Sequence, residues 1–122
     1  MKTPLKLGPV GPNTEYMPEP DAERLAATLV AFANADGGTI LLGLHPDGSA
    51  AEGLFGEEME GALRSALLQC RPPIRTEWEQ VETPGGTVAA IQVPRSTELH
   101  ALDDGRVLIR SGAENRALGG EQ

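Results

Sequence analysis

Apolar residues recur along this chain at the spacings that distinguish helices from strands. Between residues 21 and 35 they follow the i, i+4, i+7, i+8 spacing of one buried helical stripe, formed by Leu25, Leu29, Phe32 and Ala33. Asp21 can accept hydrogen bonds from the first N–H groups of such a helix, and Asp36-Gly37-Gly38 would end it with residues that tolerate positive φ. The pattern therefore predicts a helix over 21–35.

A strand should follow this helix directly. Thr39 to Leu44 form an apolar run of strand length, which is typical of a central strand covered on both faces. A second helical stripe predicts a helix near 57–70, and its members are Met59, Leu63, Ala66, Leu67 and Cys70. Pro72-Pro73 cannot continue a helix, so the second helix should stop before them.

The remaining segments have the alternation and the turn residues of strands. Ile74–Val81 and Thr87–Val93 flank the turn sequence Thr83-Pro84-Gly85-Gly86 and therefore predict a β-hairpin. Short strands are also predicted around Thr14-Glu15-Tyr16 and over Arg106–Arg110. Together these elements predict an α+β domain in which two main helices pack on a mixed, mostly antiparallel sheet.

Length and composition limit what this domain can do. Its 122 residues fit one domain, which we place over 1–122 with an extended arm at 1–12 and a tail at 118–122. The formal net charge of -8 makes nucleic acid an unfavourable default partner. Cys70 is the one cysteine and cannot form an intramolecular disulfide, and no segment has the pattern of an export signal or a membrane span. We therefore expect a cytoplasmic protein with no membrane contact.

The segment from Ala31 to Leu44 carries the densest local signal. Gly37 and Gly38 follow a helix and precede a buried strand, which predicts a close approach of the backbone to neighbouring elements. A phosphate-binding loop is disfavoured, because such loops place the N-terminus of a helix at the anion whereas this turn follows a helix C-terminus.

Short motifs along the chain occur in the order of one known family. They are Glu15-Tyr16; Ala31-Phe32-Ala33-Asn34 with Gly37-Gly38; Gly43-Leu44 with Asp47-Gly48 and Gly53-Leu54; and Ile109-Arg110-Ser111-Gly112. Over residues 10–117 the chain thereby resembles the Schlafen-type AlbA domain family, which has also been described as a divergent AAA domain. The resemblance implies a domain associated with DNA or RNA.

The resemblance also implies where an active site would lie. Animal Schlafen proteins that resemble the family cleave RNA with two glutamates in the first motif, an aspartate after the central strand and a nearby lysine. Carboxylates of this kind hold divalent cations that polarise phosphate and activate water. Here only Glu15 matches, and Asp47 is shifted into the turn. The other three positions hold Val10, Met17 and His45-Pro46.

We therefore interpret the chain as a non-catalytic binding or assembly module, with nucleic acid as one candidate partner. We expect no catalytic residue, metal site or cofactor. Schlafen proteins pair two related lobes, so a single copy is expected to form a homodimer or a higher homo-oligomer. A DNA- or RNA-binding regulatory domain is the first alternative. A divergent metal-dependent ribonuclease is the second.

Two groups of motif residues have both a structural and a chemical interpretation. Glu15 can pair with an arginine such as Arg110 while Tyr16 packs, which we prefer to a catalytic role because the catalytic partners are missing. His45 can in principle ligate a transition metal together with His100, Asp47 or Cys70, although isolated histidines are more often surface or capping residues.

Arginines and the single tryptophan leave further alternatives open. Arg110, with Arg106 and Arg116 near it in the sequence, could bind an anion such as a phosphate backbone, or could pair with the acidic residues around it. Trp78 stands between two glutamates, which disfavours base stacking and favours a place in the core or at an interface.

Overall fold

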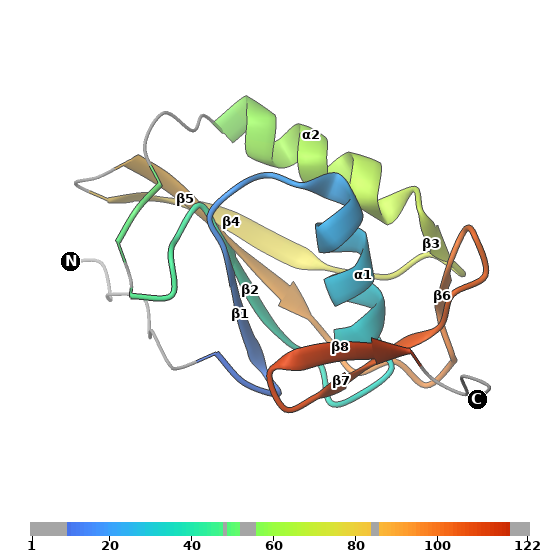
Figure 1. Cartoon of the computed structure of the whole chain (residues 1–122). Coiled ribbons are helices and arrows are strands. Elements are labelled where there is room, and N and C mark those ends of the chain that lie inside the picture. The colour runs from blue at the N-terminus through green and yellow to red at the C-terminus, as the bar shows by residue number, and fades with distance from the viewer. Residues whose placement is uncertain (1–9, 48, 52–55, 84–85, 118–122) are drawn as a thin grey trace.

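The computed structural model describes residues 10–47, 49–51, 56–83 and 86–117, and Figure 1 shows their arrangement. The elements are, in chain order, β1 (Thr14–Met17), α1 (Ala22–Ala33), β2 (Gly38–Leu42), α2 (Gly56–Leu67), β3 (Cys70–Arg71), β4 (Glu77–Thr83), β5 (Gly86–Val93), β6 (Ala101–Leu102), β7 (Leu108–Ser111) and β8 (Glu114–Ala117). The α+β class is confirmed. The motif Gly53-Leu54, the turn at 84–85, most of the predicted arm and the tail lie outside the described residues.

Four strands form the main sheet in the order β1-β2-β5-β4. β1 runs parallel to β2, with Glu15 opposite Ile40, whereas the β2–β5 and β5–β4 pairs are antiparallel. The prediction of a mixed, mostly antiparallel sheet is therefore confirmed. β2 lies in its interior, as expected for an apolar run with both faces covered: Ile40 belongs to one buried cluster and Leu41 to another.

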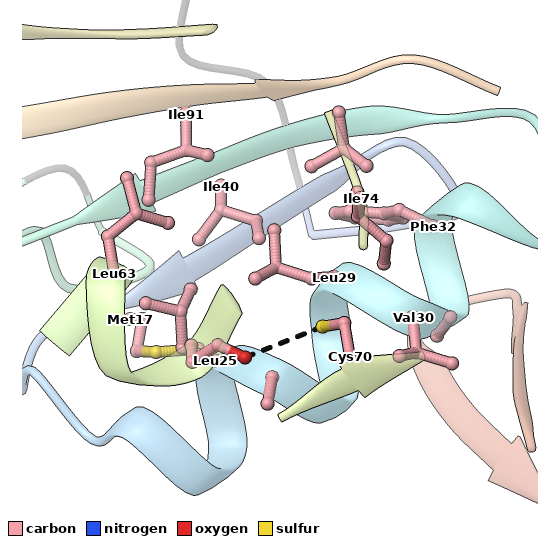
Figure 2. Packing of buried hydrophobic residues seen from close by; sticks show 14 of the residues in the cluster. Met17, Leu25, Leu29, Val30, Phe32, Ile40, Leu63, Cys70, Ile74 and Ile91 are labelled. Atoms are coloured by element: carbon pink, nitrogen blue, oxygen red, sulfur yellow. Dashed lines mark hydrogen bonds between the residues drawn. The ribbon is translucent and has the colours of Figure 1, made fainter. Parts of the chain in front are cut away.

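Both helices pack on the same face of this sheet, as Figure 1 shows. The core between the layers is built from the predicted helical stripes and from the inward side chains of the sheet, and Figure 2 labels Leu25, Leu29, Phe32, Leu63, Ile40 and Ile91 among them. Trp78 is partly buried against this core. The β7–β8 hairpin packs on α1 and completes the fold.

The predicted N-terminal end of α1 is confirmed, whereas the helix ends two residues earlier than predicted, at Ala33. The Asp21 carboxylate accepts hydrogen bonds from the backbone N–H groups of Glu23 and Arg24, at 3.1 and 3.2 Å. At the other end, Asn34 is the C-cap and Gly37 has a φ of +79°, a conformation that side chains with a Cβ rarely adopt.

The second helix is shorter than predicted. α2 ends at Leu67, and Cys70 instead begins the short strand β3, where it pairs with Leu102 of β6. The helical spacing correctly predicted that Cys70 is buried. Its thiol lies in the core and donates to the Ala66 carbonyl at 3.4 Å (Figure 2). The pattern could not show that strand pairing replaces the last helical turn.

Some strand boundaries also differ from the predicted ones. The strand predicted to start at Ile74 starts at Glu77, and the strand predicted over Arg106–Arg110 is β7, which pairs with the unpredicted β8. None of the helices in the described part of the chain is long and apolar enough to cross a membrane.

Candidate functional site

Glu15, the motif carboxylate, lies on the helix side of the sheet and is 7% exposed. Its two oxygens have different arginine partners: Oε1 lies 2.8 Å from Nη2 of Arg110, and Oε2 lies 3.1 Å from Nη2 of Arg24. The predicted pairing of Glu15 with Arg110 is confirmed. Both carboxylate oxygens therefore have a cationic partner within the protein.

The Arg110 side chain is buried, 1% exposed, and donates in several directions. Besides Glu15, its guanidinium donates to the carbonyl of Gly11 at 3.0 Å and to Oδ1 of Asn115 at 2.7 Å. Its Cζ lies 4.9 Å from the centre of the Phe32 ring, close enough for a cation–π interaction. Three separate motifs thus contribute one residue each to a single buried group: Glu15, Phe32 and Arg110.

Asn34 joins the end of α1 to the C-terminal half of the chain. Its Nδ2 donates to the carbonyls of His100 and Leu108, at 2.9 and 2.8 Å, and its Oδ1 accepts from the His100 backbone N–H at 2.8 Å. These partners are 66 and 74 positions away in the sequence. All three bonds are made to backbone groups, so Asn34 acts as a tie between segments.

His100 is buried, 3% exposed, and both of its ring nitrogens have partners. Nδ1 lies 2.8 Å from the Pro72 carbonyl, and Nε2 lies 2.7 Å from the Ser96 hydroxyl. A carbonyl can only accept, so Nδ1 carries the hydrogen, and in the neutral ring Nε2 accepts from Ser96. Neither nitrogen is left for a metal ion.

Gly37 and Gly38 lie where another residue would collide with backbone. A Cβ on Gly37 would be 2.5 Å from the Val93 carbonyl oxygen, and a Cβ on Gly38 would be 2.9 Å from the carbonyl oxygen of Asn13. The Gly37 N–H donates to the Phe32 carbonyl at 2.8 Å. This geometry confirms the close backbone approach predicted for the two glycines.

His45 and Asp47 lie in the exposed turn that follows β2. The Asp47 carboxylate accepts from the backbone N–H and the hydroxyl of Ser49, at 2.9 and 2.6 Å, and these hydrogen bonds lower its pKa. Glu15 instead faces α1 and β7. Tyr16 packs in the cluster on the other face of the sheet.

The four residues considered as metal ligands do not come together. Among the described residues, no group of three or more His, Cys, Asp and Glu side chains could hold a metal ion. The Cys70 thiol lies in the core, and burial raises its pKa to about 11, which keeps it protonated.

Each of the three arginines considered for an anion site has an acidic partner within the protein, and Arg110 is paired with Glu15. Arg106 pairs with Asp104 at 2.9 Å and Arg116 with Glu114 at 3.3 Å. Arg110 is opposite Asn115 in the hairpin, and Arg116 is opposite Ile109, so the two arginines lie on opposite faces. Alternation along the strands separates residues that the sequence places close together.

Sequence reasoning missed two other arginines, Arg75 and Arg95. Both are exposed and line the same open cleft. This cleft lies beside the open end of the β4–β5 hairpin, where β4 begins and β5 ends. No pattern in the sequence singled them out, because Arg75 has an acidic neighbour, Glu77, two positions away, just as Arg116 has Glu114. Only the fold shows which arginines find a carboxylate.

A solved structure shares this fold. The crystal structure of the DIP2311 protein from Corynebacterium diphtheriae matches with a TM-score of 0.68 and 18% identity, over 88% of this chain and 25% of that one. The chain thus spans about a quarter of the DIP2311 chain. The solution structure of the N-terminal domain of an ATP-dependent DNA helicase RecG-related protein from Nitrosomonas europaea matches with a TM-score of 0.46 and 20% identity, over 90% of this chain and 80% of that one.

Sequence comparison identifies a family, although no individual curated protein matches. A search of curated proteins gave no match. The family model described as Schlafen, AlbA_2 matches residues 13–119, which include the Glu15-Tyr16, Ala31–Asn34 and Ile109–Gly112 motifs. This match confirms the resemblance seen in the motifs: the chain belongs to the Schlafen AlbA_2 family.

Proposed function

We propose that this chain is a non-catalytic binding and assembly module of the Schlafen AlbA_2 family. The observation that supports the proposal is the state of Glu15, the one carboxylate that matches the family's nuclease motif. Its oxygens lie 2.8 and 3.1 Å from two guanidinium groups. A divalent cation would have to displace an arginine and then lie beside another positive charge, which is electrostatically unfavourable.

The neighbouring motif positions add no chemistry to Glu15. Met17, at the position of the lysine, is fully buried in the helix-side core. Val10, at the position of the other glutamate, packs against the cluster on the opposite face of the sheet. Phosphoryl transfer assisted by metal ions needs several oxygen ligands directed at one point, and this part of the chain supplies one that is already paired.

A cleavage assay tests the absence of catalysis. Labelled tRNA is incubated with the protein and Mn²⁺ or Mg²⁺, with EDTA as the blank and the Glu15→Gln variant as the control for contaminating nuclease. We expect no metal-dependent cleavage above the level of the variant. Cleavage by the wild-type protein that is lost in a folded Glu15→Gln variant would show that Glu15 is catalytic after all.

The assembly part of the proposal is a homodimer or a higher homo-oligomer. In the described part of the chain β4 is an edge of the main sheet, and edge strands can pair with a strand of another chain. Size-exclusion chromatography with light scattering, at micromolar protein concentration, should give at least twice the monomer mass of 12.8 kDa. A monomer across that range contradicts assembly and leaves the cleavage result unaffected.

A further inference from the structure

Six of the eight arginines have partners within the protein. Five pair with carboxylates: Arg24, Arg64, Arg106, Arg110 and Arg116. Arg71 donates to the carbonyls of Leu68 and Cys70. Arg75 and Arg95 have no hydrogen bond or ion pair with any described residue. These two arginines, which have no partner among the described residues, line one cleft.

The fold brings these two arginines to the same end of the β4–β5 hairpin. Glu77 is opposite Gln92 in the register, so Arg75 lies two positions before that pair and Arg95 three positions after it. Their cleft has a volume of about 480 Å³ and is open to solvent. That volume lies within the range of about 300–1,000 Å³ that small-molecule sites occupy.

The cleft is locally positive although the chain has a formal net charge of -8. Glu98 is the one acidic residue among the described residues of its lining, against two arginines, and Glu98 forms no ion pair with either of them. An adjoining cleft of about 520 Å³ shares Arg75 but is also lined by Asp36 and Glu77. These carboxylates would repel the next phosphates of a polynucleotide, whereas a ligand with one anionic group meets two arginines and the single carboxylate of Glu98.

The lining also offers contacts for an uncharged part of a ligand. Pro73, Ile74 and Pro94 supply apolar surface, and the hydroxyl of Thr97 can donate a hydrogen bond. We propose that the Arg75–Arg95 cleft binds the phosphate group of a small phosphorylated ligand, about the size of a nucleoside monophosphate. A phosphate presents oxygens in several directions, so guanidinium groups from two different loops can donate to it at once. This proposal rests on the proposed function, because it names what the non-catalytic module binds.

Calorimetric titration at low salt tests the site with defined probes. These are inorganic phosphate, AMP, adenosine, glutamate and a short oligonucleotide without a terminal phosphate. We expect AMP to bind, phosphate to compete with it and adenosine to show no binding. The double variant Arg75→Gln/Arg95→Gln should weaken AMP binding about tenfold or more, because charge-assisted hydrogen bonds supply the affinity. The matched control, Arg106→Gln/Arg116→Gln, removes the same charge elsewhere and should bind AMP like the wild type.

Other outcomes would contradict the proposed phosphate site. No AMP binding at millimolar concentration, or equal loss in the two double variants, excludes a phosphate site at Arg75 and Arg95. Tighter binding of the oligonucleotide than of AMP identifies a polynucleotide as the ligand, and tighter binding of glutamate identifies a carboxylate. Each of these results contradicts the phosphate proposal alone, whereas metal-dependent cleavage of the oligonucleotide in the same sample contradicts the non-catalytic function.

Discussion

The Arg110 guanidinium lies 2.8 Å from the Glu15 carboxylate, and the two residues are separated by most of the chain. Both side chains are almost fully buried, at 1% and 9% exposure. A buried charge is tolerated only when it is paired and hydrogen-bonded, and here Arg24, Gly11 and Asn115 complete the pairing. The motifs that identify the family therefore join β1, α1 and β7 in this protein.

Asn34 should be as important to stability as a core residue. Asn34→Ala leaves the His100 N–H and two carbonyls without their partners, so we expect a loss of about 3 kcal/mol in the free energy of unfolding. Urea unfolding measures this loss. Asn34→Asp should also destabilise, because a carboxylate cannot donate to the two carbonyls. The control Asn13→Ala removes one part-exposed bond, to Gly37, and should cost about 1 kcal/mol or less.

Gly37 and Gly61 should respond to alanine in opposite directions. Gly37→Ala places a Cβ 2.5 Å from the Val93 carbonyl oxygen at a φ of +79°, and we expect a loss of about 2 kcal/mol or more. Gly61 lies in α2 with nothing within 4 Å of an added Cβ, so Gly61→Ala should stabilise by about 0.5–1 kcal/mol. Thermal and urea unfolding of the two variants measure these changes in stability. A Gly37→Ala variant as stable as the wild type would contradict the close approach of Gly37 to the Val93 carbonyl.

Cys70 should make stability depend on alkaline pH. Burial raises the pKa of its thiol from 9.0 to about 11, so the native state binds this proton more tightly than the unfolded state does. The contribution is complete below pH 9 and is lost as pH rises through about 11. The free energy of unfolding of the wild type should therefore fall more steeply over this interval than that of Cys70→Ala.

The same burial predicts how the Cys70 thiol reacts. At pH 8 a thiol reagent should label the native protein slowly and the protein in guanidinium chloride fully, because the thiolate is the reactive form. Rapid labelling of the native protein would show that the thiol is accessible and would remove the basis of the alkaline effect.

The sequence predicted the elements whose cause is local. The stripe and the Asp21 cap defined α1, the apolar run defined β2, and alternation around a turn defined the β4–β5 hairpin. It missed β3 and β6, which have two residues each, and β8, whose exposed side chains show no apolar alternation. Strands of this kind exist because a partner strand is present, and a single-sequence pattern contains no information on the partner.

The candidate site was predictable only in its chemistry. Residue types allowed a pair of Glu15 with an arginine such as Arg110, and the structure contains this pair. The second partner, Arg24, depends on how α1 lies across β1, and the bonds of Asn34 depend on segments more than sixty positions away. Arg75 and Arg95 have no partner within the described part of the chain, and their common cleft likewise depends on the tertiary fold.

The central claim is that Glu15 holds the fold together through its buried pair with Arg110, and urea unfolding of Glu15→Gln tests it most directly. Removing one partner of a buried pair leaves Arg110 without its counter-charge, so we expect a loss of about 3 kcal/mol. The control Glu60→Gln breaks the exposed pair with Arg64 and should cost no more than about 0.5 kcal/mol. A Glu15→Gln variant as stable as the wild type would contradict the account.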